Sequence, residues 1–316
     1  MGSFLARRAL MLVAALLVSS FVIFGSLDLA PGDPLATLTG GRTLPPEAVA
    51  QLRAQYHLDD TFVVRYVDWV GNAVLHGDLG TSIAFRGSVA SVIGARAGVT
   101  IELVLYAGLL ITLFGVGLGV VSGLRRGALD TSIVASTSIL AAVPSFVAAI
   151  ILLSVFSVNL GWFPALGAGE GFADRIWHLT LPAIALALSA MAIVVRVTRV
   201  AVRTEMSREH VQTAVSRGIP SSLVVRRHVL RNAAIPVTTV VGITITSLIA
   251  LSAVVERAFS LDGLGAALVQ AALSKDFAVV QGISLIFVTA FVVANVVVDL
   301  LYAVLDPRVA IGSRAV

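Results

Sequence analysis

Six runs of the sequence contain no aspartate, glutamate, lysine or arginine and are long enough to cross a lipid bilayer. A helix needs about 20 apolar residues for one crossing. The chain is 58% hydrophobic and only 13% charged, which excludes a soluble domain of ordinary composition. The sequence therefore predicts an all-α integral membrane protein with six transmembrane helices: Ala9–Leu27, Leu103–Leu124, Thr131–Gly169, Ile176–Val195, Asn232–Val255 and Phe277–Val298.

The arginines predict which side of the membrane each loop occupies. Cytoplasmic flanks of spans are enriched in basic residues, so Arg7 and Arg8 place the N-terminus in the cytoplasm. The third run is 39 residues long, and one span in it returns residues 196–231, with eight arginines, to the cytoplasm. Two spans would put that basic segment outside. We therefore expect both termini in the cytoplasm and a non-helical tail on the third run, broken by Asn159, Gly161 and Pro164.

The N-terminal third is expected to contain one span and a helical segment outside the cytoplasm. Residues 1–30 mimic a signal peptide, but their apolar run is too long and Pro31 follows the only plausible cleavage site. They are expected to remain as the first transmembrane helix. Residues 31–99 then form a small extracytoplasmic helical segment, with helices at Pro45–Tyr56 and Phe62–Leu75, the second capped by Asp60.

The rest of the chain is expected to form the core. Residues 100–306 contain five spans and a cytoplasmic loop at 203–235, and residues 307–316 form a cytoplasmic tail. Gly115, Gly119 and Gly123 lie at i, i+4 and i+8, which lets another helix approach closely. Four further residues are expected to shape the spans: Asp130 caps the third, Pro144 kinks it, and Pro182 and Pro236 lie near the starts of the fourth and fifth.

A short polar helix separates the fourth span from the fifth. Ser207 can cap its N-terminus, and Glu209 adds negative charge to the first turn, where the helix dipole favours it. Gly218 suits a left-handed C-cap, and Pro220 prevents the helix from continuing. One face carries the apolar side chains Val211, Ala214 and Val215. These features predict a rigid knob in the cytoplasmic loop.

The knob carries a sequence motif. Glu209-x3-Thr213-Ala214-x3-Gly218, then His228-x-Leu230-Arg231-Asn232 and Pro236, resembles the EAA coupling motif of bacterial ABC importer permeases, and more narrowly their dipeptide, oligopeptide and nickel branch. The resemblance implies that the knob sits in a cleft of an ATPase subunit and that seven residues serve the coupling: Ser207, Glu209, Val211, Thr213, Ala214, Gly218 and Pro220. From the residues alone, a basic helix lying on the inner leaflet is the alternative.

Further motifs extend the resemblance over nearly the whole chain. They are Pro31-Gly32-Asp33-Pro34, Leu58-Asp59, Gly77-Asp78-Leu79-Gly80-Thr81-Ser82, the loop from Glu256 to Gly265 and the end of the last span from Asp299 to Arg308. In the loop, Asp262 stands where the family usually has proline, which puts the rigidity of that turn in doubt. The acidic residues of these motifs are candidates for docking a binding protein: Asp33, Asp78, Glu256 and Asp262.

The resemblance implies a fold like that of a type I ABC importer permease and a set of partners. These are a homologous permease subunit, one fused or two separate ABC ATPase subunits, and an extracytoplasmic substrate-binding protein, around a multi-pass chain in the cytoplasmic membrane of a bacterium. The only lysine, Lys275, does not follow a glycine-rich loop, so the chain has no P-loop. We therefore expect no catalytic residue, cofactor or metal in this chain, with ATP and Mg²⁺ in the partner subunits, and no nucleic-acid partner.

Other functions remain as alternatives at this point. An ion-coupled secondary transporter is less well supported, because no acid lies at a span centre and no internal repeat is evident. Di- and oligopeptides lead as substrates, with nickel chelates or other solutes as alternatives. Polar and kinking residues inside the spans are candidates for lining the pathway, although hydroxyls in apolar helices often bond their own backbone instead: Pro144, Thr238, Thr239, Thr244, Thr246 and Ser247.

Overall fold

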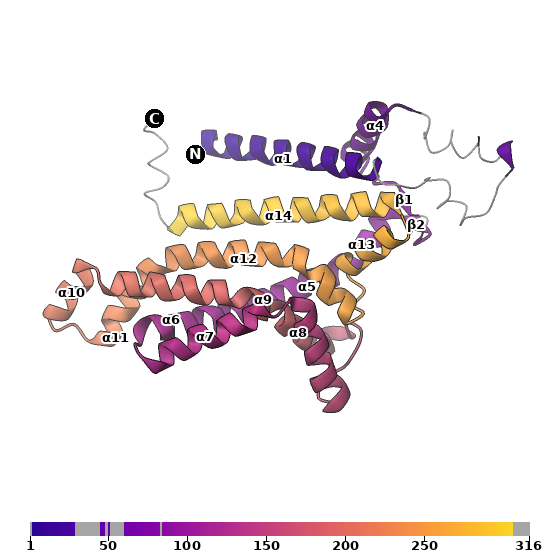
Figure 1. The fold of residues 1–316 in the computed structure, drawn as a ribbon. Helices are drawn as coiled ribbons and strands as arrows, with labels where there is room; N and C mark the ends of the chain where they lie inside the picture. The colour runs from indigo at the N-terminus through magenta and orange to yellow at the C-terminus, as the bar shows by residue number, and fades with distance from the viewer. Residues whose placement is uncertain (1, 29–44, 48–49, 51–59, 83, 306–316) are drawn as a thin grey trace. The chain divides into compact units, whose positions relative to one another are not determined.

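The computed structural model describes residues 2–28, 45–47, 50, 60–82 and 84–305, and these are mostly helical (Figure 1). A two-stranded antiparallel hairpin pairs Thr81 with Ser88 and Ser82 with Gly87. The α-helices and strands, in chain order, are α1 Gly2–Asp28, α4 Phe62–Leu75, β1 Thr81–Ser82, β2 Gly87–Ser88, α5 Val89–Leu110, α6 Gly117–Leu124, α7 Ala128–Ala142, α8 Ser145–Leu152, α9 Gly171–Met206, α10 Glu209–Ser216, α11 Ser221–Val224, α12 Arg231–Ala258, α13 Leu264–Leu273 and α14 Phe277–Leu305. Three π-helical segments, Ile111–Val116, Leu153–Asn159 and Val225–Leu230, continue α5, α8 and α11.

The chain divides into two compact units. The first unit contains residues 100–261 and the chain from residue 291 onward, and the second contains residues 2–99 and 262–290. The division passes through α5 and α14, so each of these helices contributes to both units. The predicted helix Pro45–Tyr56 and the motif around Asp33 lie largely or wholly outside the described residues, whereas α4 has the predicted bounds. The N-cap of α4 is Thr61 and not Asp60.

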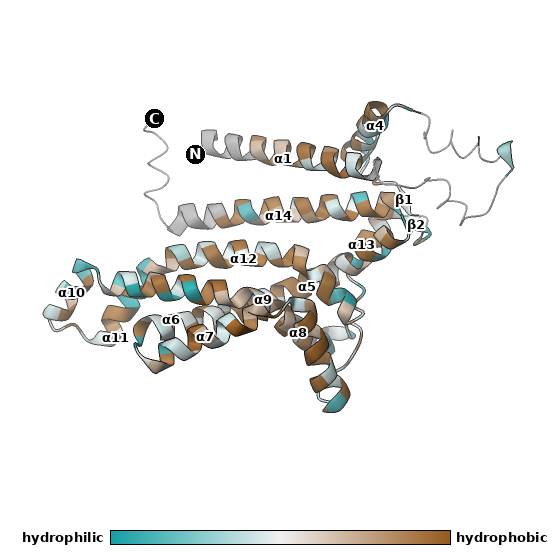
Figure 2. Cartoon of the chain, in the orientation of Figure 1, coloured by the Kyte–Doolittle hydropathy of each residue, from teal (hydrophilic) through white to brown (hydrophobic). Residues whose placement is uncertain are grey.

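Apolar helices dominate both units (Figure 2). Within the described residues, four stretches are long and apolar enough to cross a membrane: Val89–Leu124, Gly171–Met206, Ser221–Ala258 and Phe277–Val298. A bent pair, Ala128–Ala142 with Ser145–Asn159, gives a fifth candidate, and Leu10–Ser26 of α1 forms a shorter apolar helix. The multi-pass architecture is thus confirmed, and the count of six spans and their orientation stay predictions.

The third predicted span is broken and not merely kinked. The helix axes on the two sides of Val143 and Pro144 differ by 95°. Val143 has the extended backbone that a following proline favours, and Pro144, at ψ 143°, starts α8 as its N-cap residue. Beyond Asn159, residues 160–170 are non-helical, as the sequence predicts for the tail of this run.

Two helices are longer than the apolar runs that predicted them. α9 continues past Val195 to Met206, so Arg196 lies inside the helix and not at its end. Pro182 also lies well inside α9 and is buried, in contrast to its predicted place near the start. Pro236 is internal in the same sense, because the helix runs back from α12 through the π-helical segment Val225–Leu230 to Ser221.

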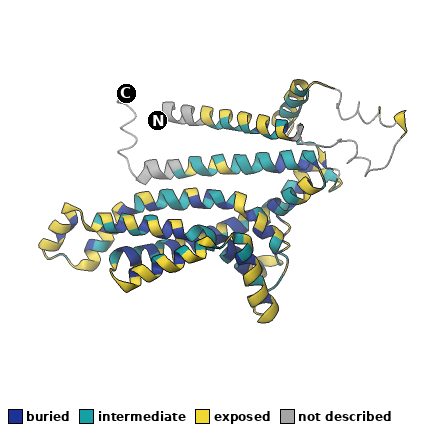
Figure 3. Ribbon diagram, viewed as in Figure 1, coloured by how far each residue is buried: buried dark blue, intermediate teal, exposed yellow. Residues whose placement is uncertain are grey.

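In the first unit, α9 is the central helix and packs against α6, α7, α8 and α12. Many of its residues are buried, and buried residues are dark blue in Figure 3, which has the view of Figure 1. The glycine stripe of α6 makes one of these contacts possible. A Cβ on Gly119 would lie 2.5 Å from the Cβ of Thr198, and one on Gly123 would lie 2.8 Å from the Cβ of Val202. The prediction that these glycines admit a neighbouring helix is therefore confirmed.

The second unit has its own apolar core between the start of α5, α13 and the start of α14. Val89, Ala271 and Ile283 are fully buried there. Asp276, 1% exposed, holds the hairpin against this core, because its Oδ2 accepts hydrogen bonds from the Ser82 hydroxyl (2.6 Å) and the Ala84 backbone N–H (2.9 Å). Both of these donors come from the hairpin region, more than 190 residues away in sequence. The Val279 backbone N–H of α14 also donates, to Oδ1 of the same carboxylate (3.4 Å).

Candidate functional site

The predicted knob is a helix–turn–helix at one end of the α9–α12 pair (Figure 1). α10 begins at Glu209, one residue later than it would if Ser207 were its N-cap. Ser207 keeps a helical backbone, ends α9, and donates its hydroxyl to the Thr204 carbonyl (2.8 Å). The extended residue is Arg208, and its carbonyl accepts from the backbone N–H groups of Val211 and Gln212. The prediction that Ser207 caps the knob is therefore wrong, because α9 extends further than its apolar pattern.

The turn after α10 is held by a complete Schellman motif. Gly218 has φ +76°, and its N–H donates to the Val215 carbonyl (2.9 Å). The Ile219 N–H donates to the Ala214 carbonyl (3.2 Å), and Ile219 also packs against the apolar cluster that contains Ala214. Pro220 then becomes the N-cap residue of α11. The predicted left-handed cap at Gly218 is confirmed, and it fixes the angle between α10 and α11.

The apolar face of α10 packs against this chain. Val211 (1% exposed) and Ala214 (5%) join a cluster with Val202 of α9, Val224 of α11 and Val229 of the π-helical segment. Val215, which was expected on the same face, is 58% exposed. Val211 and Ala214 therefore belong to the interior of the knob, and their role in coupling to an ATPase stays a prediction. The packing makes α10 a rigid extension of α9 and α12.

The opposite face of α10 is polar and exposed. It carries the four side chains that lie on one side of the helix at i, i+3, i+4 and i+7: Glu209, Gln212, Thr213 and Ser216. Beside it, Asn232 donates to the His228 carbonyl (2.9 Å) and lies 3.3 Å from His210 Nε2, which ties α10 to the start of α12. Two predicted coupling residues, Glu209 and Thr213, thus occupy the surface that another protein could contact.

A buried ion cluster, which the sequence did not predict, lies where α6, α7 and α9 meet. The Asp130 carboxylate accepts hydrogen bonds from the Ser122 hydroxyl (2.5 Å), from Arg199 Nη2 (2.8 Å) and from Arg203 Nη2 (2.8 Å). Asp130 is 7% exposed and Ser122 is fully buried. The N-cap of α7 is Gly127, so Asp130 is not the predicted cap. The signal in the sequence was Asp130 itself, an acidic residue close to the arginines that flank the cytoplasmic ends of the predicted spans.

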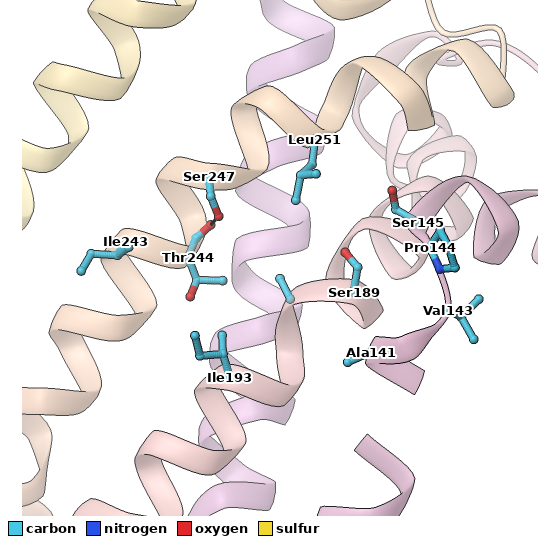
Figure 4. A pocket seen from close by; sticks show the side chains of 11 residues that line it. Ala141, Val143, Pro144, Ser145, Ser189, Ile193, Ile243, Thr244, Ser247 and Leu251 are labelled. Atoms are coloured by element: carbon cyan, nitrogen blue, oxygen red, sulfur yellow. Dashed lines mark hydrogen bonds between the residues drawn. The ribbon is translucent and has the colours of Figure 1, made fainter. Parts of the chain in front are cut away.

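A cavity of about 570 Å³ brings three of the predicted pathway residues together (Figure 4). Pro144 comes from the break between α7 and α8, and Thr244 and Ser247 come from α12. Ser145 and Ser189 add two hydroxyl-bearing side chains that the sequence prediction did not include. Ala141, Val143, Ala190, Ile193, Ile243 and Leu251 complete a mostly apolar wall.

The other pathway candidates lie elsewhere. Thr238 lines a second cavity of about 400 Å³ between α6, the π-helical segment Ile111–Val116, α9 and α12. Thr239 and Thr246 donate to the carbonyls four residues earlier, Ile235 (3.1 Å) and Gly242 (2.8 Å). Ser247 also donates to its own helix, to the Thr244 carbonyl (2.7 Å). The hydroxyls of Thr239, Thr246 and Ser247 therefore bond to the backbone of their own helix, which is the alternative to lining a pathway.

The candidates for docking a binding protein separate into exposed and buried residues. Asp78 is exposed and accepts from the Gly80 N–H (2.8 Å), and Asp262 is exposed and paired with Arg96 (2.7 Å). Glu256 is 0% exposed, and its carboxylate accepts from the Thr100 hydroxyl (2.8 Å). Its side chain belongs to the core of the first unit, which corrects the expectation that it docks a partner. Asp33 lies outside the described residues.

The fold is similar to that of one chain of an ABC transporter of known structure. It matches a chain of the MetNI methionine ABC transporter in an inward-facing conformation, with a TM-score of 0.56 over 69% of this chain and 97% of that chain. Sequence identity is 16%, so this likeness concerns the fold alone. In the described part of the chain, no group of three or more His, Cys, Asp or Glu residues could hold a metal ion.

The chain belongs to the family of binding-protein-dependent transport system inner membrane components. The model of this family matches residues 115–311, and the model of its N-terminal part matches residues 1–103. The chain is 36% identical to the oligopeptide transport system permease protein AppB of Bacillus subtilis, over 98% of this chain and 99% of the relative. It is 34% identical to the di/tripeptide transport system permease protein DppB of Pseudomonas aeruginosa, with the same coverage. The family predicted from the sequence is therefore confirmed.

Proposed function

We propose that this chain is one of two homologous permease subunits of an ATP-driven importer of di- and oligopeptides in the cytoplasmic membrane of a bacterium. Family membership supports the transport role, and the names of the relatives AppB and DppB support peptides as the substrate. One fused or two separate ATPase subunits hold ATP and Mg²⁺, and an extracytoplasmic binding protein delivers the substrate. The proposed topology has six spans, with α10 and both termini in the cytoplasm.

The observation that carries the coupling role is the construction of α10. Its apolar face is anchored to α9, α11 and the start of α12, and its polar face is exposed. A helix held in this way transmits a displacement to α9 and α12 as a rigid body, because a close-packed interior deforms little. Both of these helices line the cavity at Pro144, Thr244 and Ser247. We infer that movement of α10 by an ATPase changes the shape of this cavity, which forms part of the peptide pathway.

Substitution of Thr213 tests the ATPase contact. Thr213→Trp adds volume on the exposed polar face without disturbing the apolar cluster, so the chain should fold normally while ATPase binding weakens by roughly tenfold or more. The measurement is the amount of ATPase that co-purifies with the membrane subunits from detergent. The matched control is Arg126→Trp, an exposed position in the turn between α6 and α7. Equal ATPase recovery for both variants and wild type would favour the inner-leaflet alternative, since tryptophan suits a membrane interface.

Peptide transport itself is tested in proteoliposomes that contain the complete importer with its binding protein. ATP-dependent uptake of a labelled tripeptide is expected, and an excess of unlabelled di- or tripeptides should compete with it. A nickel chelate should not compete, because the relatives that support the assignment are named as peptide permeases. Uptake of the nickel chelate without uptake of any peptide would contradict the proposed substrate and leave the permease fold and family unchanged.

A further inference from the structure

The helix α4 of the second unit presents three different stripes along its length. The stripe that faces α1 is aromatic: the ring of Phe62 lies 5.5 Å from that of Phe21, and the ring of Tyr66 lies 5.3 Å from it. Trp69 continues this stripe, with its ring 5.9 Å from Phe24. The Tyr66 hydroxyl is 2.8 Å from the Ser20 hydroxyl, so the polar end of the ring is satisfied at the contact. This stripe fixes α4 to α1.

The second stripe is apolar and exposed. Val63, Val67 and Val74 fall on one side of the helix at i, i+4 and i+11, and they are 62%, 58% and 76% exposed. The third stripe contains the exposed polar residues Asp68 and Asn72, roughly 120–160° around the helix from the valine stripe. The exposed apolar residues Val64 (46%) and Leu75 (77%) lie between the two stripes and widen the apolar side. A helix with apolar and polar sides of this kind, and with no fully buried residue, needs a surface that is apolar on one side and wet on the other.

The position of such a surface can be inferred from α1, the helix against which α4 packs. α1 has an apolar, exposed surface over Leu10–Ser26, with Val18 64% and Val22 59% exposed, as expected of a helix in contact with lipid. Figure 1 shows α4 crossing the C-terminal part of α1 at a steep angle. The contacts at Phe21 and Phe24 lie four to seven residues before Asp28, or roughly 6–10 Å along the helix axis.

We propose that α4 is an interfacial helix that lies in the plane of the membrane, with its valine stripe on the lipid acyl chains and Asp68 and Asn72 facing water. The depth of its contacts on α1 corresponds to the about 5–10 Å at which amphipathic helices settle into the headgroup boundary. Trp69 and Tyr66 lie at the level where amphipathic rings are favoured. Lipid that contacts the exposed surface of α1 would also cover the valine stripe of α4, because the two helices are packed together.

The test uses single cysteines in this naturally cysteine-free chain. Val67→Cys on the valine stripe and Asn72→Cys on the polar stripe are each labelled with the small fluorophore NBD, in the assembled importer reconstituted in lipid nanodiscs. Val18→Cys in α1 is the control for lipid contact. Brominated lipids are expected to quench the label at positions 18 and 67, and aqueous iodide to quench the label at position 72.

Each other pattern of quenching has a definite meaning. Quenching at position 67 by iodide places the valine stripe in water, and quenching there by neither agent means that a protein partner covers it. Lipid quenching at both 67 and 72 means that α4 is immersed and not interfacial. Any of these results overturns the proposal. The proposal rests on α1 as a membrane helix and not on the transported solute, and loss of lipid quenching at position 18 would identify a failure of that premise.

Discussion

Substitution of Gly119 by leucine is expected to prevent stable packing of α6 against α9. A Cβ at this position would lie 2.5 Å from the Cβ of Thr198 and 2.9 Å from the Val195 carbonyl oxygen. The oxygen belongs to the backbone of α9, so no side-chain rotation can relieve the contact, and the helices must separate. Overpacking of a core typically costs about 1–3 kcal/mol, and we expect Gly119→Leu to reach or exceed the upper end of this range.

The measurement is the fraction of the detergent-solubilised complex that stays monodisperse in size-exclusion chromatography after heating through a series of temperatures. Gly117→Leu is the matched control, since Gly117 is exposed in the same helix and no atom lies within 4 Å of its added Cβ. The same added side chain should leave the melting curve near that of wild type at position 117. Equal melting of the two variants would show that α6 does not approach α9 closely at Gly119.

The features that the sequence predicted correctly follow from local rules. Apolar runs mark membrane helices because the backbone must satisfy its own hydrogen bonds in lipid. The period of α4 and the left-handed requirement at Gly218 are also readable within a few residues. The glycine stripe of α6 predicted a close helix contact in the same way, since only small residues permit one. None of these rules identifies the partner of an element.

The features that were missed depend on residues far apart in sequence. Asp130 was interpreted as a local cap, but its partners Arg199 and Arg203 are 69 and 73 residues away. Glu256 begins the predicted loop motif, but it is buried, and its partner Thr100 is 156 residues away. For α10, amphipathic spacing identified an apolar face at Ala214, and the same spacing results whether that face packs on its own chain or on a partner.

Replacement of Asp130 by alanine is expected to give the second large loss of stability. The carboxylate joins the Ser122 hydroxyl of α6 to two guanidinium groups of α9. Removal of one partner from a buried ion cluster leaves the remaining charges without compensation, and this is strongly destabilising. The Arg199 and Arg203 side chains are 26% and 32% exposed, so water can replace only part of the hydrogen bonding and charge compensation that the carboxylate provides. We expect roughly a tenfold or greater fall in the yield of folded complex.

Two further variants separate charge from volume at this cluster, and a third is a control at an exposed ion pair elsewhere. Glu102→Ala removes an acid from an ion pair with Arg175 in which both side chains are 40% exposed, and pairs of this kind contribute little, so near-normal yield is expected. Asp130→Asn keeps the shape and should still lower the yield. A triple variant, Asp130→Leu with Arg199→Met and Arg203→Met, removes all three charges and should recover much of it, because an apolar replacement leaves no unpaired charge. If Asp130→Ala and the triple variant lower the yield equally, the charges of Arg199 and Arg203 do not cause the defect. In that case the shape of the Asp130 side chain, and not its charge, would hold α7 against α9.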